Sequence, residues 1–420
     1  MLRLLIYSLF SSMLFFWTTG SMEYDSYIPF VGYLAGITLL EIFIISMYML
    51  FGKNENRQEM NGLIISAVLM NVGMSVNYRC IDLDQGMSAV FKSTYLADLI
   101  LMLIAFILMY LIIRYTKLYR FKIINIFIFF ALPVSVFGAR ISGRMTGGSY
   151  LYFAGFLIFG LVLMGFPFVA AWFMSAKENS YFGGKVGNVS WNLISFLLYT
   201  FLIYGGCVLC NEFGLLLVVG LTATVLFFIR CKDVKTKTLY TVFCVGGVLI
   251  ACLKISHVWS RIQIWLDPAA AYSDENLKEK AESVLYLFRN IQNMGWWGKG
   301  IGNLSKRIYP TLNTDHALIL LINDYSIFLC IIVIVLGMLF VRWMLICPKG
   351  LCVYDRYLNL ASALIVCFII LIDVSSNLGS FITAGIGFPW ISEGSSVNLM
   401  LTVLMAIHCG LLGKKVVEDA

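Results

Sequence analysis

Apolar stretches of about 20 residues, the length with which an α-helix crosses the hydrocarbon core of a bilayer, recur along the whole chain. No stretch of 100 residues lacks one, so we predict no separate soluble domain. Charged residues make up only 13% of the chain, about half the share of a typical soluble domain. We therefore predict an all-α polytopic membrane protein of about twelve transmembrane helices. The predicted spans lie near residues 2–20, 28–51, 62–78, 89–113, 123–139, 153–175, 190–209, 213–229, 239–257, 316–341, 357–379 and 397–413.

Basic residues are distributed unevenly between the loops that join these spans. With the N-terminus in the cytoplasm, four basic residues fall in the short outside loops, namely Arg79, Lys92, Arg140 and Arg144. The eighteen inside residues are Arg3, Lys53, Arg57, Arg114, Lys117, Arg120, Lys122, Lys177, Lys185, Arg230, Lys232, Lys235, Lys237, Arg342, Lys349, Arg356, Lys414 and Lys415. This asymmetry matches the positive-inside rule and predicts that both termini are cytoplasmic. The net charge of +7 therefore reports topology and does not indicate a nucleic-acid partner.

Cysteine and histidine give no strong sign of a metal site. Most of the eleven cysteines lie inside apolar segments, where cysteine behaves as a small hydrophobic residue. Cys207 and Cys210 have the spacing of a metal-binding pair, but they lie mid-membrane without a second pair. Only three histidines are present, so a histidine-built metal centre is not expected.

The predicted outside loop 258–315 departs from the charge pattern, because it mixes seven basic residues with six acidic ones. Disorder is one interpretation of a loop this long. Tryptophan and tyrosine side chains among the charges instead favour ordered helices at the membrane interface. The stretch 276–293 has helical periodicity with its charges on one face, so we expect a helix there.

The second half of this loop carries the first candidate site residues. Gly298 and Gly300 flank Lys299, and glycine backbone beside a cation suits phosphate, although this signal is weak on its own. Asp315 stands where the chain re-enters the membrane. It is expected either to cap the next helix, together with Thr314, or to act as a general base at the membrane face.

Other acidic residues lie inside the predicted spans, where charge is costly and indicates function or a buried ion pair. They are Glu41, Glu212, Asp324 and Asp373. The last outside turn, residues 377–396, is rich in glycine and serine. Because irregular backbone at membrane depth needs surrounding protein or a polar cavity, we predict a re-entrant loop there.

Several stretches, in order along the chain, resemble the SEDS family (shape, elongation, division and sporulation proteins FtsW, RodA and SpoVE). Arg261–Pro268 is similar to an arginine followed by a Leu-Asp-Pro turn, and Gly298–Asn303 is similar to G-x-G-[LI]-G-N. Pro310–Asp315 resembles P-E-x-H-T-D. The stretches Asn377–Gly379 and Gly385–Ser396 resemble N-x-G and G-[IL]-P-L-P-F-[IV]-S-x-G-G-S-S. Two earlier stretches, Gly138–Arg140 and Glu212–Gly214, lie where G-A-x-R-W and D-[LF]-G would fall.

The resemblance implies a ten-span core over residues 61–420 with the large loop 258–315, preceded by an N-terminal two-span addition over residues 1–60. It implies a peptidoglycan glycosyltransferase that polymerises lipid II, an undecaprenyl-pyrophosphate-linked substrate, at the outer face of the bacterial cytoplasmic membrane. Asp315 would be the catalytic base. The residues expected to bind substrate are Arg261, Lys299, Arg140, Gly298, Gly300, Ser392 and Ser396, with Lys306 and Arg307 as second choices. The expected partner is a class B penicillin-binding transpeptidase, and a divalent cation could share the pyrophosphate charge.

The sequence also departs from the family pattern. Thr311 and Asn313 replace the glutamate and histidine before the T-D pair, and Ser395 replaces a glycine. Three alternatives therefore stay open. The chain could be a lipid II flippase, a degenerate partner of the transpeptidase, or more distantly an O-antigen polymerase or ligase.

Overall fold

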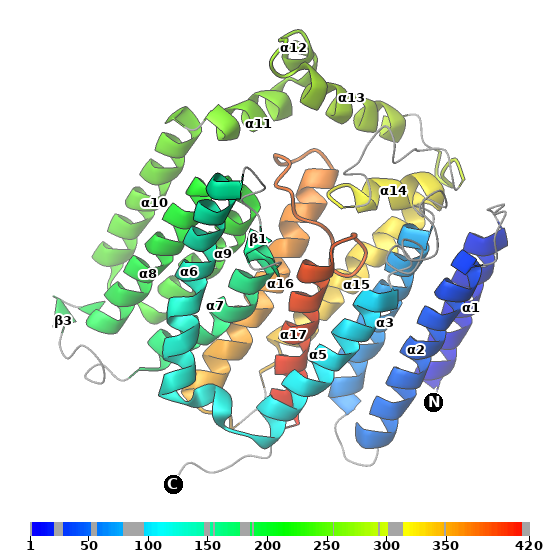
Figure 1. Cartoon of the computed structure of the whole chain (residues 1–420), viewed down its shortest axis with the longest axis horizontal. Coiled ribbons are helices and arrows are strands. Elements are labelled where there is room, and N and C mark those ends of the chain that lie inside the picture. Colours follow the sequence, from blue (N-terminus) through cyan, green and yellow to red (C-terminus); the bar gives the residue numbers. More distant parts are fainter. Residues whose placement is uncertain are drawn as a thin grey trace. The chain divides into compact units, whose positions relative to one another are not determined.

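A computed structural model describes residues 2–20, 28–51, 57–78, 96–146, 152–153, 156–176, 185–186, 189–254, 256–292, 295–300, 314–347 and 350–413. Helices dominate this part of the chain (Figure 1). The strands within it form two short antiparallel pairs, β1 (Tyr152–Phe153) with β2 (Phe156–Leu157) and β3 (Lys185–Val186) with β4 (Val189–Ser190). The predicted all-α polytopic class is confirmed.

Nine helices of the described chain are long and apolar enough to cross a membrane, and Leu4–Thr19 and Ser396–Leu412 are shorter apolar helices. Each predicted span overlaps a helix, while the number of twelve spans stays a prediction. The helices of at least 18 residues, whatever their hydropathy, are α1 (Leu2–Gly20), α2 (Ile28–Phe51), α3 (Arg57–Tyr78), α5 (Leu96–Tyr115), α6 (Lys122–Thr146), α7 (Ile158–Ser175), α8 (Trp191–Leu209), α9 (Phe213–Arg230), α10 (Val234–Lys254), α15 (Ile327–Leu345), α16 (Val353–Asn377) and α17 (Ser395–Leu412).

One predicted span is divided. The stretch 316–341 consists of a short helix, α14 (Ala317–Asp324), and of α15, which begins at Ile327. Tyr325 and Ser326 separate the two, and we refer to this pair as the helix break. The Ser326 hydroxyl accepts a hydrogen bond from the Leu329 N–H at 3.1 Å, so Ser326 caps a new helix within one predicted span.

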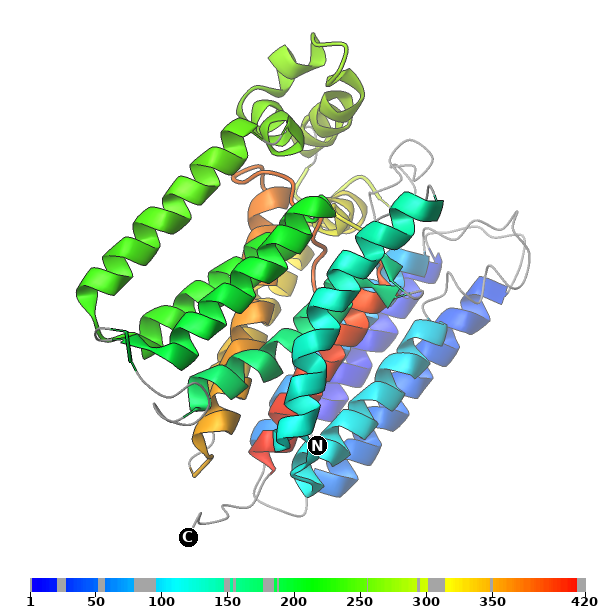
Figure 2. The same ribbon diagram turned by 60° about the vertical axis from the view of Figure 1, so that its left-hand side comes forward.

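The chain folds into two compact units. The first comprises Met1–Leu108, Ile264–Trp343 and Ile369–Thr402. Within it, α1 and α2 pack against α3, and the three helices run side by side (Figures 1 and 2). Its largest fully buried side chains include Trp390, Tyr33 and Tyr325.

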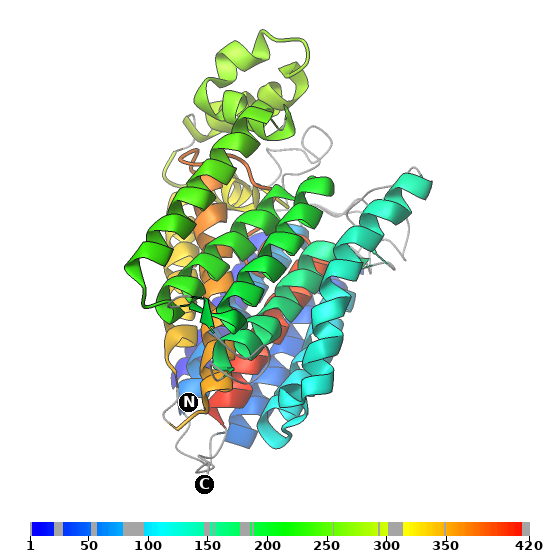
Figure 3. The ribbon, with the colours of Figure 1, turned by 90° about the vertical axis from the view of Figure 1, so that its left-hand side faces the viewer.

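The second unit comprises Met109–Gln263, Met344–Phe368 and Val403–Ala420. Helices α6, α7, α8 and α9 pack against one another within it, and Figure 3 shows them in cyan to green. Phe166, Phe196 and Phe227 are fully buried in this unit. Tyr240 of α10 adds to the packing, because its ring lies 4.4 Å from that of Phe227.

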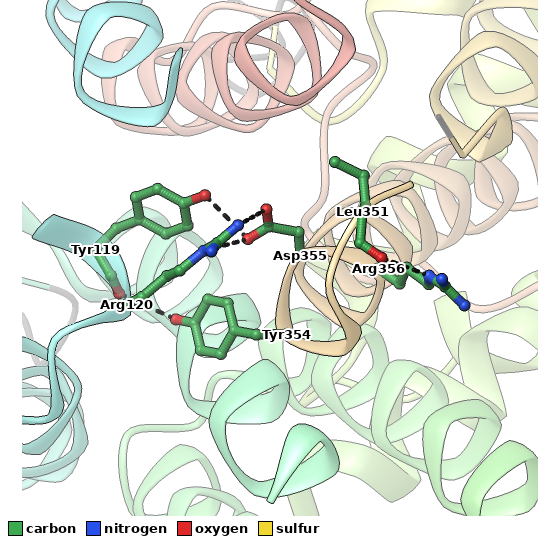
Figure 4. A network of polar contacts seen from close by, with 6 residues as sticks. All are labelled: Tyr119, Arg120, Leu351, Tyr354, Asp355 and Arg356. Atoms are coloured by element: carbon green, nitrogen blue, oxygen red, sulfur yellow. Dashed lines mark hydrogen bonds and ion pairs between the residues drawn. The ribbon is translucent and has the colours of Figure 1, made fainter. Parts of the chain in front are cut away.

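A buried ion pair ties the loop before α6 to the start of α16 in the second unit (Figure 4). Asp355 has no exposed surface, and both of its oxygens accept hydrogen bonds from Arg120 in the short helix η2 (Leu118–Arg120). The Tyr119 hydroxyl donates to the same carboxylate at 2.9 Å. The Tyr354 hydroxyl contacts Asn125 Oδ1 at 2.9 Å. These contacts compensate for burying the charge of Asp355.

The predicted outside loop is ordered over residues 256–292. It contains α11 (Ser256–Leu266), α12 (Pro268–Tyr272) and α13 (Lys278–Gln292), and α13 confirms the helix expected over 276–293. Asp267 of the Leu-Asp-Pro turn caps α12, because its Oδ1 accepts hydrogen bonds from the next helix's N–H groups. The helices share a small core formed by Ile264, Ala271, Leu277 and Ala281.

Candidate functional site

The short helix α14 connects Asp315 to the helix break. Every residue from Ala317 to Asp324 is buried, so the helix has a fixed place inside the first unit. The N-cap position belongs to His316, whose side chain makes no capping hydrogen bond. Asp315 therefore stands one residue before the N-cap position of this helix.

Asp315 is held through its main chain by the end of α16. The Asn377 side-chain amide donates to the Asp315 carbonyl at 3.1 Å, and to the carbonyl and Oδ1 of Asp373 at 3.0 Å each. Asp373 is 1% exposed, and its carboxyl interacts electrostatically with that of Asp315. The cation that would neutralise a buried carboxylate is not found beside Asp373 among the described residues, where Asn377 is its hydrogen-bond partner. The N-x-G motif includes Asn377, but nothing in the sequence predicts its hydrogen bonds to Asp315 and Asp373.

The turn between α16 and α17 packs against Asp315. We refer to residues 378–394 as the re-entrant loop, since most of the stretch from Ile382 to Ser392 is buried although it is not helical. A Cβ on Gly387 would lie 2.8 Å from the Thr314 carbonyl oxygen, so only glycine permits this approach. At Gly385 the same position lies 4.0 Å from Asp315 Oδ2. The predicted irregular backbone is confirmed, and it forms one wall beside Asp315.

Side chains of α17 and the loop itself fix the conformation of the re-entrant loop. Trp390 has a φ of 59°, which is unusual for a residue other than glycine. Its main-chain N–H donates to Asn398 Oδ1 at 2.9 Å, and its indole N–H donates to Thr402 at 3.0 Å. The Ser392 hydroxyl accepts from the Phe388 N–H at 2.7 Å. Ser392, predicted to bind substrate, therefore has an observed role in holding the loop.

The glycine loop, residues 295–300, contacts the opposite end of α14. The Lys299 N–H donates to the Asn323 carbonyl at 2.7 Å, and the Ile327 N–H donates to the Trp296 carbonyl at 3.3 Å. Gly298 and Gly300 have φ values of 70° and 88°, which glycine adopts without strain. A Cβ on Gly298 would lie 2.7 Å from the Asn323 carbonyl oxygen. Gly298 thus approaches a helix end closely, whereas we expected glycine backbone here to approach a phosphate.

The remaining predicted site residues are more widely distributed. Lys299 is exposed, and its main chain lies at the end of α14 that is far from Asp315. A helix of eight residues is about 12 Å long, which separates the two ends. Arg140 of α6 and Arg261 of α11 are half-buried and belong to the second unit, where Arg140 lies near Cys210. Ser396 is half-buried in the first turn of α17. Lys306 and Arg307 fall outside the described residues.

His316 is a second titratable group next to Asp315. Its imidazole is 9% exposed and precedes the spanning helix α15. Its buried position leaves Asp315, which is only partly buried, as the more accessible proton acceptor. No group of three or more His, Cys, Asp or Glu side chains that could hold a metal ion occurs in the searched, described part of the chain.

The fold and this arrangement define a polytopic α-helical membrane protein with a carboxylate between a short buried helix and a re-entrant loop. The sequence model of the cell cycle protein family FtsW, RodA and SpoVE matches residues 60–412. The chain therefore belongs to this family, which confirms the predicted SEDS membership.

Curated relatives carry one family name. The chain is 24% identical over 254 residues to the probable peptidoglycan glycosyltransferase FtsW of Pseudoalteromonas translucida, an alignment that covers 57% of the chain and 61% of the relative. It is 23% identical over 168 residues to the protein of the same name from Lactococcus lactis, with 39% of each chain covered. The chain thus spans less than two thirds of these relatives.

Solved structures share the fold. A chain from a study of the structural coordination of polymerization and crosslinking by a peptidoglycan synthase complex has a TM-score of 0.62 at 16% identity, with 84% of this chain and 96% of that chain covered. The rod shape determining protein RodA of Thermus thermophilus gives a TM-score of 0.51 at 15% identity, with coverages of 84% and 94%. Likeness at this identity establishes the architecture only.

We predict that Gly298→Ala destabilises the first unit, because alanine at a φ of 70° is strained and its methyl group would displace the Asn323 carbonyl. The expected loss is more than about 1 kcal/mol in the free energy of unfolding. Gly295→Ala is the matched control, since nothing lies within 4 Å of its Cβ position, and it should change stability by less than about 0.5 kcal/mol. Thermal unfolding in detergent measures both, and equal stabilities of the two variants would contradict the account.

Proposed function

We propose that this chain is a peptidoglycan glycosyltransferase that polymerises lipid II, with Asp315 as the catalytic base. The observation that carries the proposal is the convergence on Asp315 of Asn377 and the re-entrant loop, which come from separate family motifs. The names of the FtsW relatives support the same activity.

The reaction joins two undecaprenyl-pyrophosphate-linked sugars. An acceptor hydroxyl attacks the anomeric carbon of the donor, the bond from that carbon to the pyrophosphate breaks, and undecaprenyl pyrophosphate leaves. Asp315 takes the hydroxyl proton as the new glycosidic bond forms. Its partly buried carboxylate suits this role, because its main chain is fixed by Asn377 while its side chain is not fully enclosed.

Negative charge develops on the leaving pyrophosphate, and cations stabilise it. In this proposal Arg140, Arg261 and Lys299 bind the phosphates. Gly298 and Gly300 shape the backbone beside Lys299, and Ser392 and Ser396 line the acceptor side. A divalent ion bound with the substrate would supply further positive charge at the pyrophosphate.

The decisive variant is Asp315→Asn, which keeps the size of the side chain but cannot accept a proton at neutral pH. Loss of a general base is expected to lower the rate of lipid II polymerisation by about a hundredfold or more. Stability should change by less than about 0.5 kcal/mol, since Asp315 does not occupy the N-cap of α14. The measurement is polymerisation by purified protein, alone and with its candidate transpeptidase, together with thermal unfolding.

Glu282→Gln is the control, because it neutralises an exposed carboxylate on α13 of the outside loop. It should retain the wild-type rate. An Asp315→Asn variant with wild-type turnover would refute the catalytic assignment. A wild-type protein that is inactive beside an active FtsW would instead support a non-catalytic partner of the transpeptidase.

We also propose the finer topology and partner. Both termini lie in the cytoplasm, the loop 258–315 lies outside, and residues 1–60 form an addition to a core over 61–420. The basic residues of the inside loops support this orientation, and the family match from residue 60 supports the boundary. A class B penicillin-binding transpeptidase is the proposed partner, in keeping with the synthase complex named for the structural neighbour.

The orientation predicts opposite labelling of two exposed positions. In intact cells, a membrane-impermeant maleimide should modify cysteine placed by Glu275→Cys, before α13, but not cysteine placed by Lys235→Cys in α10. Permeabilised cells provide the control in which both positions react. Labelling of position 235 from outside would contradict the proposed orientation of the chain in the membrane.

A further inference from the structure

Helix α1 lies outside the family match, yet it contacts the helix break directly. Tyr325 is 1% exposed, and its hydroxyl lies 2.9 Å from Thr18 Oγ1 of α1. Thr18 gives its own proton to the Leu14 carbonyl at 2.8 Å, so the Tyr325 hydroxyl is the donor in the bond between the helices. The Trp17 ring packs edge-on against Tyr325 at 5.4 Å.

A second set of polar contacts holds α1 against α3. The Asn71 amide donates to the Tyr7 hydroxyl at 3.4 Å and to the Ser11 hydroxyl. Asn71 and Ser11 have no exposed surface, and Tyr7 is 3% exposed. Hydrogen bonds between buried side chains hold helices together within a bilayer, where apolar surfaces alone provide little preference. Helix α1 is therefore docked in a defined register.

The break that α1 contacts is one end of the element that presents Asp315. Helix α14 has eight residues, all buried, and Asp315 lies two positions before its first residue. At the Asp315 end, Asn377 holds the main chain. At the other end, the glycine loop binds Asn323 and α1 binds Tyr325. A shift at either end of so short a rigid helix is transmitted to the opposite end.

We propose that α1 is a positioning helix for the catalytic carboxylate, and that Thr18 and Tyr325 are its positioning residues. This inference rests on the proposed glycosyltransferase function of Asp315. It assigns a role in turnover to the N-terminal pair of helices, which precedes the part of the chain matched by the family. The competing interpretation is that α1 and α2 only anchor the chain in the membrane.

Four variants separate these interpretations. Thr18→Val and Tyr325→Phe each remove one hydroxyl of the bond while keeping a similar side-chain shape. Thr18→Ser retains the hydroxyl and should restore function. Thr19→Val is the matched control, because Thr19 makes the same bond to a carbonyl four residues earlier, Phe15 at 2.8 Å, and is only partly buried.

A displacement of the reacting group by about 1 Å lowers turnover strongly, so we expect kcat for lipid II polymerisation to fall about tenfold in Thr18→Val and in Tyr325→Phe. KM should stay near the wild-type value, since the substrate-binding residues are unchanged. The double variant should be no slower than either single variant, because one bond is lost in each case. Thr18→Ser and Thr19→Val should keep wild-type kcat.

An activity-independent measurement accompanies the kinetics. Cysteine placed by Asp315→Cys is modified by a maleimide, and mass spectrometry of the peptide containing residue 315 gives the rate. Adding Tyr325→Phe should change this rate, whereas adding Thr19→Val should not. Unchanged labelling together with unchanged kcat in an active enzyme would overturn the inference. An inactive wild type with altered labelling in the Tyr325→Phe background would refute the proposed function but keep the positioning role.

Discussion

The helix break at Tyr325 and Ser326 imposes the constraint on which the rest of the site depends. Interrupting a helix inside an apolar environment frees main-chain N–H and C=O groups, and each must find a partner within the protein. The glycine loop supplies two of these partners, to Asn323 and Ile327, and the Ser326 hydroxyl supplies a third. The break is therefore stabilised by the glycine loop, which follows α13 in the chain and is linked in this way to α14.

This arrangement explains why motifs far apart in the sequence belong to one site. Helix α14 is contacted at its Asp324 end by the glycine loop, while Asn377 and the re-entrant loop contact the segment that carries Asp315. The C-terminal end of α11 is held at the re-entrant loop, because the Trp265 indole donates to the Gly379 carbonyl at 3.0 Å. These contacts hold the main chain of Asp315 in one place, which the proposed role as a general base requires.

The fold class, the positions of the helices and the presence of ordered helices between α10 and α14 could be predicted from the sequence. The length and the periodicity of the apolar stretches determine these features directly. The helix break was missed, because neither glycine nor proline lies near Tyr325 and the apolar stretches on both sides of it together have the length of one span. Gly298 was associated with phosphate because a glycine beside a lysine indicates a close approach without identifying what is approached, and the structure places the Asn323 carbonyl there. The role of Asn377 depends on a contact 62 residues away along the chain, which no local pattern encodes.

Amide hydrogen exchange at the glycine loop tests the central claim most directly. If the helix break is held as described, the Lys299 N–H, bonded to the Asn323 carbonyl at 2.7 Å, exchanges as slowly as the amides of α14. The Glu275 N–H, in the exposed turn between α12 and α13, provides the fast reference. Exchange of the Lys299 N–H at the rate of the Glu275 N–H would contradict the account.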